Sequence, residues 1–333
     1  MSALDNPQNG IPLLRIQGLC KDFASGGLWG GSARVIDNVD MEVHAGEVRG
    51  IVGESGSGKT TLARCCLRLI EPSSGKVRFD GQDLASLSPA ALRARRREFQ
   101  MVFQDAFASL NPGMTVGQVL LEPLEIHGIG NEEFRSLRVR ELLESVSLSA
   151  SLIQRKSSEL SGGQQQRLGI ARALALKPRL LIADEPVSAL DASVQAQILN
   201  LLAELKRQND FTLILISHSL HAVHYLCSHV SVLYRGRLIE EAPARSFFSE
   251  PKHPYSRMLL DALPVLGPAD RPPASSAPAA DSPDSNILPG CAYRACCPHR
   301  LPVCGEKVPP LREVGPQEKV ACFLYAQKPD RPC

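Results

Sequence analysis

The sequence predicts an α/β fold built around a phosphate-binding loop, with a small Cys-rich extension at its carboxyl end. Three observations predict this fold class. Short apolar runs alternate with amphipathic helical patterns from residue 13 to about 266, which is typical of a parallel sheet covered by helices. A GxxxxGK[ST] motif stands at 53–60 within this region. The composition then changes abruptly after residue 266.

The composition excludes several classes of protein. Of 333 residues, 44% are hydrophobic and 22% are charged, which argues against a disordered, collagen-like or coiled-coil chain. The formal net charge is +2, whereas a dedicated nucleic-acid-binding protein usually carries a basic excess, so no nucleic-acid partner is expected. No apolar run approaches the length of a membrane span and the first ten residues do not resemble a secretory signal, so we expect a cytoplasmic chain.

Changes in composition divide the chain into four segments. Residues 1–12 are expected to be a disordered tail and 13–266 the main domain. Residues 267–290 contain six prolines and almost no large apolar side chains, so we interpret them as a linker. Residues 291–333 hold too few apolar residues for a core of their own and form the Cys-rich extension.

The first chemical motif is the phosphate loop. The apolar strand Val48–Val52 leads into it and a helical stretch at 61–70 follows, which is the setting that the motif requires. Its glycines let backbone N–H groups turn toward an anion, and the helix amino terminus adds its positive dipole end. Lys59 reaches the outer phosphates and the Thr60 hydroxyl can hold Mg²⁺. We expect ATP to be bound by Gly53, Glu54, Ser55, Gly56, Ser57, Gly58, Lys59, Thr60 and Thr61.

Two adjacent carboxylates end a second buried strand. Residues 180–183 are continuously apolar, as in a central parallel strand, and Asp184 and Glu185 follow. Neighbouring strand residues point to opposite faces, so the two acids should have different roles. We assign Asp184 to the Mg²⁺ ion and Glu185 to the water that attacks the phosphate.

A second glycine-opened helix start lies in LSGGQ at 160–164. Ser161 is expected to cap the helix that follows, where apolar residues recur at helical spacing. Such a start is a second anion site without a phosphate lysine of its own, so it makes sense if it closes on phosphates held by another subunit. Its candidate residues are Ser161, Gly162, Gly163 and Gln164.

These motifs, in this order, resemble the nucleotide-binding subunits of ABC transporters. The resemblance implies a P-loop ABC-type domain, with a RecA-like parallel sheet core and a helical subdomain at about 105–165. It implies that Gln104 contacts Mg²⁺ and senses the membrane partner, and that Asp191, in SALD, lies in a loop that spans the dimer seam. It also implies that His218 contacts the γ-phosphate, although Ser219 stands where an Asp commonly follows.

The same resemblance implies an aromatic residue that stacks on adenine. Phe23 is assigned to this role, and Trp29 stays as the alternative because the glycine-rich segment 25–32 blurs the register.

Longer stretches at 103–112, 183–202 and 251–264 are similar to the oligopeptide, dipeptide and nickel importers, with Ala106 where proline is usual. This family implies a second ATPase subunit, two integral permease subunits and, indirectly, an extracytoplasmic solute-binding protein. It places the chain peripherally on the cytoplasmic face of a prokaryotic membrane, where it would hydrolyse ATP to import di- or oligopeptides. Nickel or a metallophore, an opine and a sugar remain alternative solutes, and PVSALDASVQAQ leans toward the second of the two ATPase types.

Two other functions were considered. Non-transport ABC ATPases of translation or DNA repair share the motifs, but they tend to carry tandem cassettes or long heptad insertions, and this sequence has neither. A P-loop kinase would not need the second anion site.

Six of the ten cysteines lie in the last 43 residues. The spacing Cys291-x5-Cys297-x6-Cys304-x17-Cys322 supplies the four thiolates that a [4Fe–4S] cluster requires, and the family resemblance points the same way. Zinc and free thiols remain alternatives, although no CxxC pair typical of structural zinc is present. Cys296 could replace Cys297, and Cys333 and His299 are more distant candidates.

Overall fold

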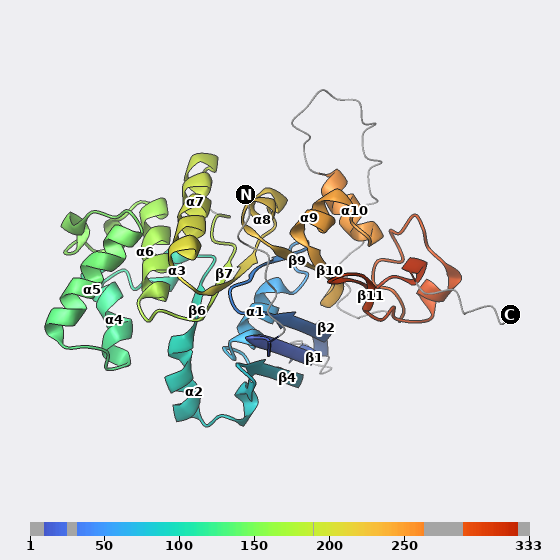
Figure 1. Cartoon of the computed structure of the whole chain (residues 1–333), viewed down its shortest axis with the longest axis horizontal. Helices are drawn as coiled ribbons and strands as arrows, with labels where there is room; N and C mark the ends of the chain where they lie inside the picture. The colour runs from blue at the N-terminus through green and yellow to red at the C-terminus, as the bar shows by residue number, and fades with distance from the viewer. Residues whose placement is uncertain (1–9, 25–31, 189, 263–288, 326–333) are drawn as a thin grey trace.

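The computed structural model describes residues 10–24, 32–188, 190–262 and 289–325. Two sheets form its framework (Figure 1). The larger, mixed sheet has the strand order β11-β12-β10-β9-β3-β8-β7-β6, and the smaller, antiparallel sheet has the order β2-β1-β4-β5. Trp29, Ala189 and Cys333 lie outside the described residues.

The centre of the larger sheet consists of parallel strands. They are β9 (His229–Tyr234), β3 (Val48–Val52), β8 (Thr212–Ile216), β7 (Leu180–Asp184) and β6 (Phe99–Val102). Every residue of β3, β7 and β8 is buried, as is typical of central parallel strands. The charged side chain inside β3, Arg49, is paired with Glu47 and Glu241. The carboxyl ends of these strands therefore meet at one edge, where the loops that carry chemistry begin.

The smaller sheet covers one face of the larger sheet. It consists of β2 (Ser32–Val43), β1 (Leu14–Ala24), β4 (Ser74–Phe79) and β5 (Gln82–Asp83). Its apolar side chains, such as Leu14 and Ile36, share one core cluster with Leu62 of the first helix and Ile214 of β8. A separate core cluster on the other face joins the larger sheet to most of the helices.

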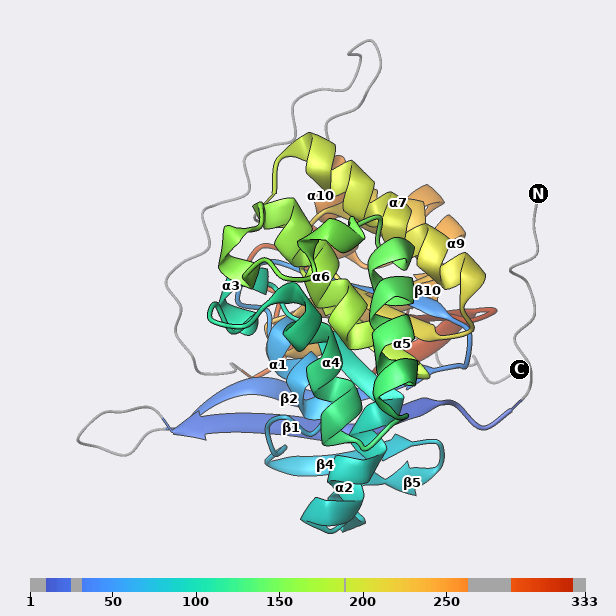
Figure 2. The ribbon, with the colours of Figure 1, turned by 90° about the vertical axis from the view of Figure 1, so that its left-hand side faces the viewer.

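Helices of different length surround the sheets (Figures 1 and 2). They are α1 (Lys59–Cys66), α2 (Pro89–Arg95), α3 (Ala106–Ser109), α4 (Val116–Ile126), α5 (Glu132–Ser145), α6 (Gly162–Leu174), α7 (Ala192–Gln208), α8 (Leu220–Leu226), α9 (Ala244–Ser249) and α10 (Pro254–Asp261). Helix α1 is shorter than the predicted 61–70, because Leu67 caps it and Arg68 takes a left-handed φ of 49°. Within the described ranges, none of the helices combines the length and apolar character that a bilayer crossing requires.

Helices α4, α5 and α6 pack together on one side of the molecule (Figure 2). Thr115 caps α4 in a reciprocal box with Gln118, and Asn131 caps α5 through the Phe134 N–H. Buried residues such as Leu120 and Leu143 pack in one cluster with Leu168 of α6. Helices α4 and α5 lie within residues 105–165, where the helical subdomain is expected, and α6 begins near the end of that range.

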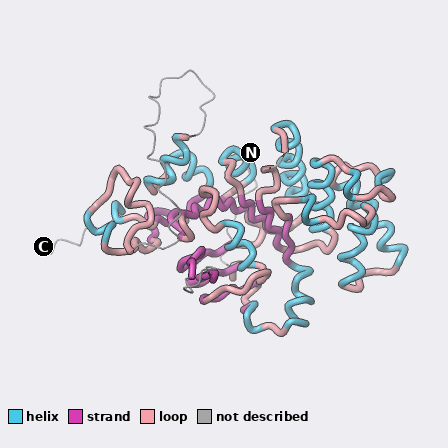
Figure 3. The backbone as a smooth tube through the Cα atoms, turned by 180° about the vertical axis from the view of Figure 1, so that it is seen from behind, coloured by secondary structure: helices cyan, strands magenta, loops and turns pink. Residues whose placement is uncertain are grey.

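The carboxyl-terminal extension continues the larger sheet. Strand β10 (Arg237–Pro243) pairs with β9 on one side and with β12 (Glu318–Val320) on the other, and β12 pairs with β11 (Arg312–Gly315). Figure 3 shows these strands following on from the central ones. The sequence pattern does not indicate that residues of the extension pack into the core of the main domain, as Tyr293 does. The side chain of Tyr293 is only 5% exposed.

Candidate nucleotide site

The phosphate loop joins β3 to α1 in a closed, tightly packed conformation. Gly53 has a φ of 152°, and a Cβ on it would lie 2.1 Å from the Leu233 carbonyl oxygen. Gly58 has a φ of 102°, and a Cβ there would lie 2.9 Å from the Val35 carbonyl oxygen. Only glycine fits both positions, so these two residues of the motif are required by conformation and by close backbone approach.

Lys59 folds back over its own loop. Its Nζ donates to the carbonyl oxygens of Gly53 at 2.8 Å and Glu54 at 2.7 Å, and its side chain is almost entirely buried. Burial lowers the pKa of Lys59, while Glu185, Asp184 and Glu54 act to raise it. The ammonium group therefore rests on acceptors that a phosphate oxygen would have to replace.

Thr60 and Asp184 come together although they are 124 residues apart in the sequence. The Thr60 hydroxyl donates to Asp184 Oδ1 at 3.0 Å. Burial raises the pKa of Asp184, an effect that the Thr60 hydrogen bond opposes. A hydroxyl and a carboxylate oxygen at this position are ligands of the type that Mg²⁺ prefers.

Glu185 lies beside two other predicted site residues. Gln104 Nε2 donates to Glu185 Oε2 at 2.9 Å, and His218 Nδ1 lies 3.5 Å from the same oxygen. The Glu185 backbone has a left-handed φ of 44° and its N–H donates to the Ile216 carbonyl at 2.9 Å. This turn separates the Glu185 side chain from that of Asp184, so the two adjacent carboxylates have different partners.

The LSGGQ segment begins α6. Ser161 accepts from the Gln164 N–H, and the Gln164 side chain accepts from the Ser161 N–H, so the predicted cap is present as a reciprocal box. Ser161 and Gly162 are exposed. A Cβ on Gly163 would lie 2.7 Å from Val194 Cγ1, which keeps this position small. The hydrogen bonds of Ser161 and Gln164 thus close on the segment itself, and none of those described reaches the phosphate loop.

Asp191 and Phe23 make no described hydrogen bond to Lys59, Thr60, Asp184 or Glu185. Asp191 caps α7 by accepting from the Val194 N–H at 2.9 Å, which lowers the pKa of its carboxyl. Phe23 lies near the end of β1, is 41% exposed, and has Lys21 Nζ 4.9 Å from its ring centroid. Its ring is therefore accessible, whereas the alternative, Trp29, is outside the described residues.

Comparison with known proteins gives two family matches. Residues 36–188 match the model described as "ABC transporter", and residues 239–304 match that of the "Oligopeptide/dipeptide transporter, C-terminal region". A putative peptide import ATP-binding protein of Brucella ovis is 46% identical over 312 residues, which is 94% of this chain and 98% of that protein. The chain belongs to the ABC transporter ATP-binding proteins. It is accordingly an ATPase subunit, a family property that explains the grouping of carboxylates around Lys59.

Other relatives and solved structures agree with this family. The oligopeptide transport ATP-binding protein AppF of Bacillus subtilis is 42% identical, with 89% of this chain and 91% of that protein covered. The dimeric, ADP- and Pi-bound ATP-binding cassette MJ0796 has a TM-score of 0.64 at 30% identity and covers 70% of this chain and 99% of its own. CbiO1 of Clostridium perfringens, part of an ABC transporter complex, has a TM-score of 0.63 at 28% identity over 72% of this chain and 92% of its own.

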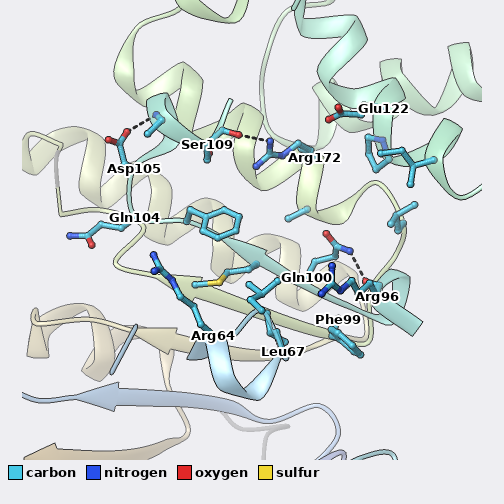
Figure 4. Close-up of a pocket in the computed structure, with 18 of the residues that line it drawn as sticks. Arg64, Leu67, Arg96, Phe99, Gln100, Gln104, Asp105, Ser109, Glu122 and Arg172 are labelled. Carbon is cyan, nitrogen blue, oxygen red and sulfur yellow. Dashed lines mark hydrogen bonds between the residues drawn. The ribbon is translucent and has the colours of Figure 1, made fainter. Parts of the chain in front are cut away.

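A groove of about 700 Å³ lies beside the site of this ABC ATPase (Figure 4). It runs between α1, β6 and the α4 and α6 helices, and Gln104 is one of its lining residues. Apolar side chains line much of it, including Leu69 and Ile126, which are 41% and 52% exposed. Gln104 therefore borders the groove and also contacts Glu185.

The cysteines of the extension lie near one another without forming a preformed metal site. Burial raises the pKa of the Cys291, Cys297 and Cys322 thiols, and negative charge on the other cysteines of this set, including Cys304, would raise it further. Burial raises the pKa of Tyr234 and Tyr293, and negative charge on the neighbouring Cys296 would raise it further. However, the described part of the chain holds no group of three or more His, Cys, Asp or Glu side chains at metal-binding distance. The predicted iron–sulfur cluster is thus not shown.

One contact of the phosphate loop could not be predicted from the sequence. Tyr255, in the first turn of α10, accepts a hydrogen bond at 3.1 Å from the Glu54 N–H. The two residues are 201 positions apart. In the sequence, the stretch 251–264 indicates only a family resemblance. No rule of residue spacing predicts a hydrogen bond between Glu54 and Tyr255.

Proposed function

We propose that this chain is the ATP-hydrolysing subunit of an ABC importer of di- and oligopeptides. It would dimerise with a second ATPase subunit and dock on two integral permease subunits at the cytoplasmic face of a prokaryotic membrane, and an extracytoplasmic solute-binding protein would deliver the solute. The observation that carries the chemistry is the meeting of Lys59, Asp184 and Glu185 at the carboxyl ends of the buried strands β3 and β7, which lie on either side of β8. Peptide as the solute is supported by relatives of the same length that are named peptide import ATP-binding proteins.

Nucleotide binding would begin with an exchange of partners at Lys59. Its Nζ leaves the carbonyls of Gly53 and Glu54 for the outer phosphates, and Phe23 stacks on adenine. Thr60, Asp184 and Gln104 would hold Mg²⁺, which neutralises phosphate charge when bound. The oxygen atoms that these side chains offer fit that ion, and the direct Thr60–Asp184 hydrogen bond already places two of them together.

Hydrolysis would use Glu185 and His218. Glu185 polarises the attacking water. His218, whose Nδ1 lies 3.5 Å from Glu185 Oε2, contacts the γ-phosphate. Ser161, Gly162 and Gly163 of the opposing subunit then supply N–H groups to the transferring phosphoryl group, with Gln164 as the partner of the Ser161 cap and Asp191 at the seam. Because the site is complete only when two subunits close, turnover is coupled to a conformational change.

The permease would dock in the groove of Figure 4. A helix with an apolar face fits the exposed side chains of Leu69 and Ile126, while Arg64 and Glu122 at the groove offer polar contacts. Gln104 gives this surface a direct path to the water-polarising carboxylate, because it lines the groove and donates to Glu185.

Reconstituted vesicles test the proposal as a whole. The chain is assembled with its partner ATPase, permeases and solute-binding protein, and uptake of labelled di- and oligopeptides is measured with and without ATP. ATP-dependent peptide uptake that is lost in the Glu185→Gln variant is expected. Uptake of nickel, an opine or a sugar in place of peptide would refute the assigned solute, and the absence of ATP hydrolysis would refute the function.

We further propose that Cys291, Cys297, Cys304 and Cys322 hold a [4Fe–4S] cluster. These four thiols interact with one another, and backbone N–H groups two residues onward point at three of them, from Tyr293, His299 and Leu324. Such N–H groups stabilise thiolate ligands. When bound, the cluster would cross-link a segment that lacks a core of its own. Anaerobic purification followed by a visible spectrum and metal analysis tests this, and a colourless protein with stoichiometric zinc or no metal would refute it.

A further inference from the structure

The peptide group that opens the phosphate loop is held from both of its polar ends. The Gly53 carbonyl accepts from Lys59 Nζ, and the Glu54 N–H of the same peptide bond donates to the Tyr255 hydroxyl. The close approach of Gly53 to the Leu233 carbonyl leaves this peptide little freedom to move sideways. Its orientation is therefore set by two side chains, of which Lys59 alone has a proposed role with nucleotide.

Tyr255 is itself packed inside a cluster of three tyrosines from distant parts of the chain. Its side chain is fully buried. Its ring centroid lies 4.5 Å from that of Tyr234 on β9 and 5.5 Å from that of Tyr293 in the extension, and these two rings are 5.5 Å apart. Centroid separations and tilted or edge-on geometries of this kind are favourable for aromatic pairs. Tyr293 thus forms one wall of the pocket that holds the Tyr255 ring.

The extension also holds the segment that leads into α10. The Tyr325 hydroxyl donates to the Lys252 carbonyl at 3.1 Å and accepts from Arg257 at 3.0 Å. The buried Glu240 carboxylate accepts from the Lys252 and His253 N–H groups at 2.7 and 2.8 Å. Helix α10 is therefore fixed between strand β10 and the extension, and Tyr255 has little room to shift.

We propose that Tyr255 is a positioning residue of the phosphate loop, and that the carboxyl-terminal extension holds it in place through Tyr293. The inference rests on the proposed function, since it assumes that MgATP binds at the loop. When Lys59 leaves the Gly53 carbonyl for a phosphate, the Tyr255 hydroxyl still fixes the other end of the peptide. Nucleotide then meets a loop that is already ordered and does not have to be ordered by the nucleotide itself.

The first test is the Tyr255→Phe variant of the full chain. It removes one hydroxyl and keeps the ring, so the fold should persist. Loss of one net hydrogen bond predicts a Kd for MgATP that rises about 2- to 10-fold in calorimetric titration. In the assembled transporter KM should rise by the same factor, while kcat stays within about 2-fold because the group acts on binding. The matched control is Tyr293→Phe, which removes a hydroxyl from the same cluster without touching the Glu54 N–H, and its Kd should equal that of the wild type.

The second test is Tyr293→Leu, which opens the wall of the pocket. It should weaken MgATP binding by a factor similar to that of Tyr255→Phe, and Tm is recorded for every variant. A wild-type Kd in Tyr255→Phe would overturn the positioning role, and a wild-type Kd in Tyr293→Leu would overturn the part of the extension. If the wild-type chain itself bound no MgATP, the proposed function would fail, and this inference with it.

Discussion

The two glycine-opened helix starts of this molecule differ in what surrounds them. At the start of α1, Lys59 is 5% exposed and the phosphate loop is packed between β3, β9 and α10. At the start of α6, Ser161 and Gly162 face outward and the cap closes on itself. Both present N–H groups that have no partner within the helix, which is the basis of anion binding. Contacts within the chain anchor the first, whereas in the proposed function the second would be completed by phosphates bound to another subunit.

Under the proposed function, the two sites would divide a single reaction between two subunits. The phosphate loop carries the buried charge: burial lowers the pKa of Lys59, and three carboxylates oppose that effect. The α6 start contributes only N–H groups and a dipole, which gain strength when water is excluded by closure. Variants at the two sites should therefore separate nucleotide binding from turnover.

The largest expected effect is that of Glu185→Gln. The amide cannot act as the base, so phosphate release by the assembled transporter should fall by about 10²- to 10⁴-fold, the usual contribution of such a group. MgATP binding should persist, and the two subunits should remain closed on unhydrolysed nucleotide. Phosphate release near the wild-type rate would show that Glu185 is not the base.

A sharper contrast comes from Gly162→Asp paired with Lys59→Ala. Gly162 is exposed, a Cβ there meets only Leu190 Cδ2 at 3.6 Å, and an acid suits the first turn of a helix, so the variant should fold. Its negative charge should repel the phosphates of the opposing subunit and lower turnover by about 100-fold, with the Kd of the isolated chain for MgATP unchanged.

Lys59→Ala should do the reverse. It removes a buried charged contact worth about 2 kcal/mol or more, so MgATP binding should weaken by roughly 30-fold or more in the isolated chain. Equal loss of MgATP binding by the isolated chain in both variants would contradict the division between the two sites.

The elements around the phosphate loop could be predicted from the sequence because each strand or helix cap is specified by a short, continuous segment. Strand β3 occurs with the predicted bounds 48–52, and the apolar run predicted at 180–183 forms most of β7, because short, mainly apolar segments are buried in the centre of a parallel sheet. The Ser161 cap follows from a serine placed three residues before a glutamine. Proximity between Thr60 and Asp184 also followed, because the carboxyl ends of parallel strands in one sheet lie along the same edge.

The carboxyl-terminal side was not readable in this way. Strand β12 pairs with β10, and the paired residues are about eighty positions apart in the sequence. Neither strand has an apolar pattern that indicates which strand it pairs with. Tyr293, Tyr255 and Tyr234 are single aromatic residues in three separate segments, so their packing depends on the finished fold. Composition predicted that the extension lacks a core, and it could not show which core the extension would join.

The last prediction concerns folding stability and a buried histidine beside Tyr255. His253 is 2% exposed and caps α10, with its Nδ1 accepting the Tyr255 N–H at 3.0 Å. Burial lowers the pKa of His253 from 6.5 to about 4, so the unfolded chain binds a proton between these values that the folded chain does not. Stability should therefore fall as pH drops from about 6.5 to about 4, by at most on the order of 3 kcal/mol.

A matched variant isolates this contribution. His253→Asn keeps an acceptor at the cap and removes the titrating ring, so its unfolding free energy should depend less on pH between 6.5 and 4. Glu240 acts in the opposite sense, because burial raises the pKa of its carboxyl and its ionised form costs stability as pH rises. That contribution is shared by both proteins and cancels in their difference. Denaturant unfolding of the full chain and of the variant across this range measures the difference. Parallel curves would mean that His253 keeps its ordinary pKa, and that the wall behind Tyr255 is more open to water than its burial indicates.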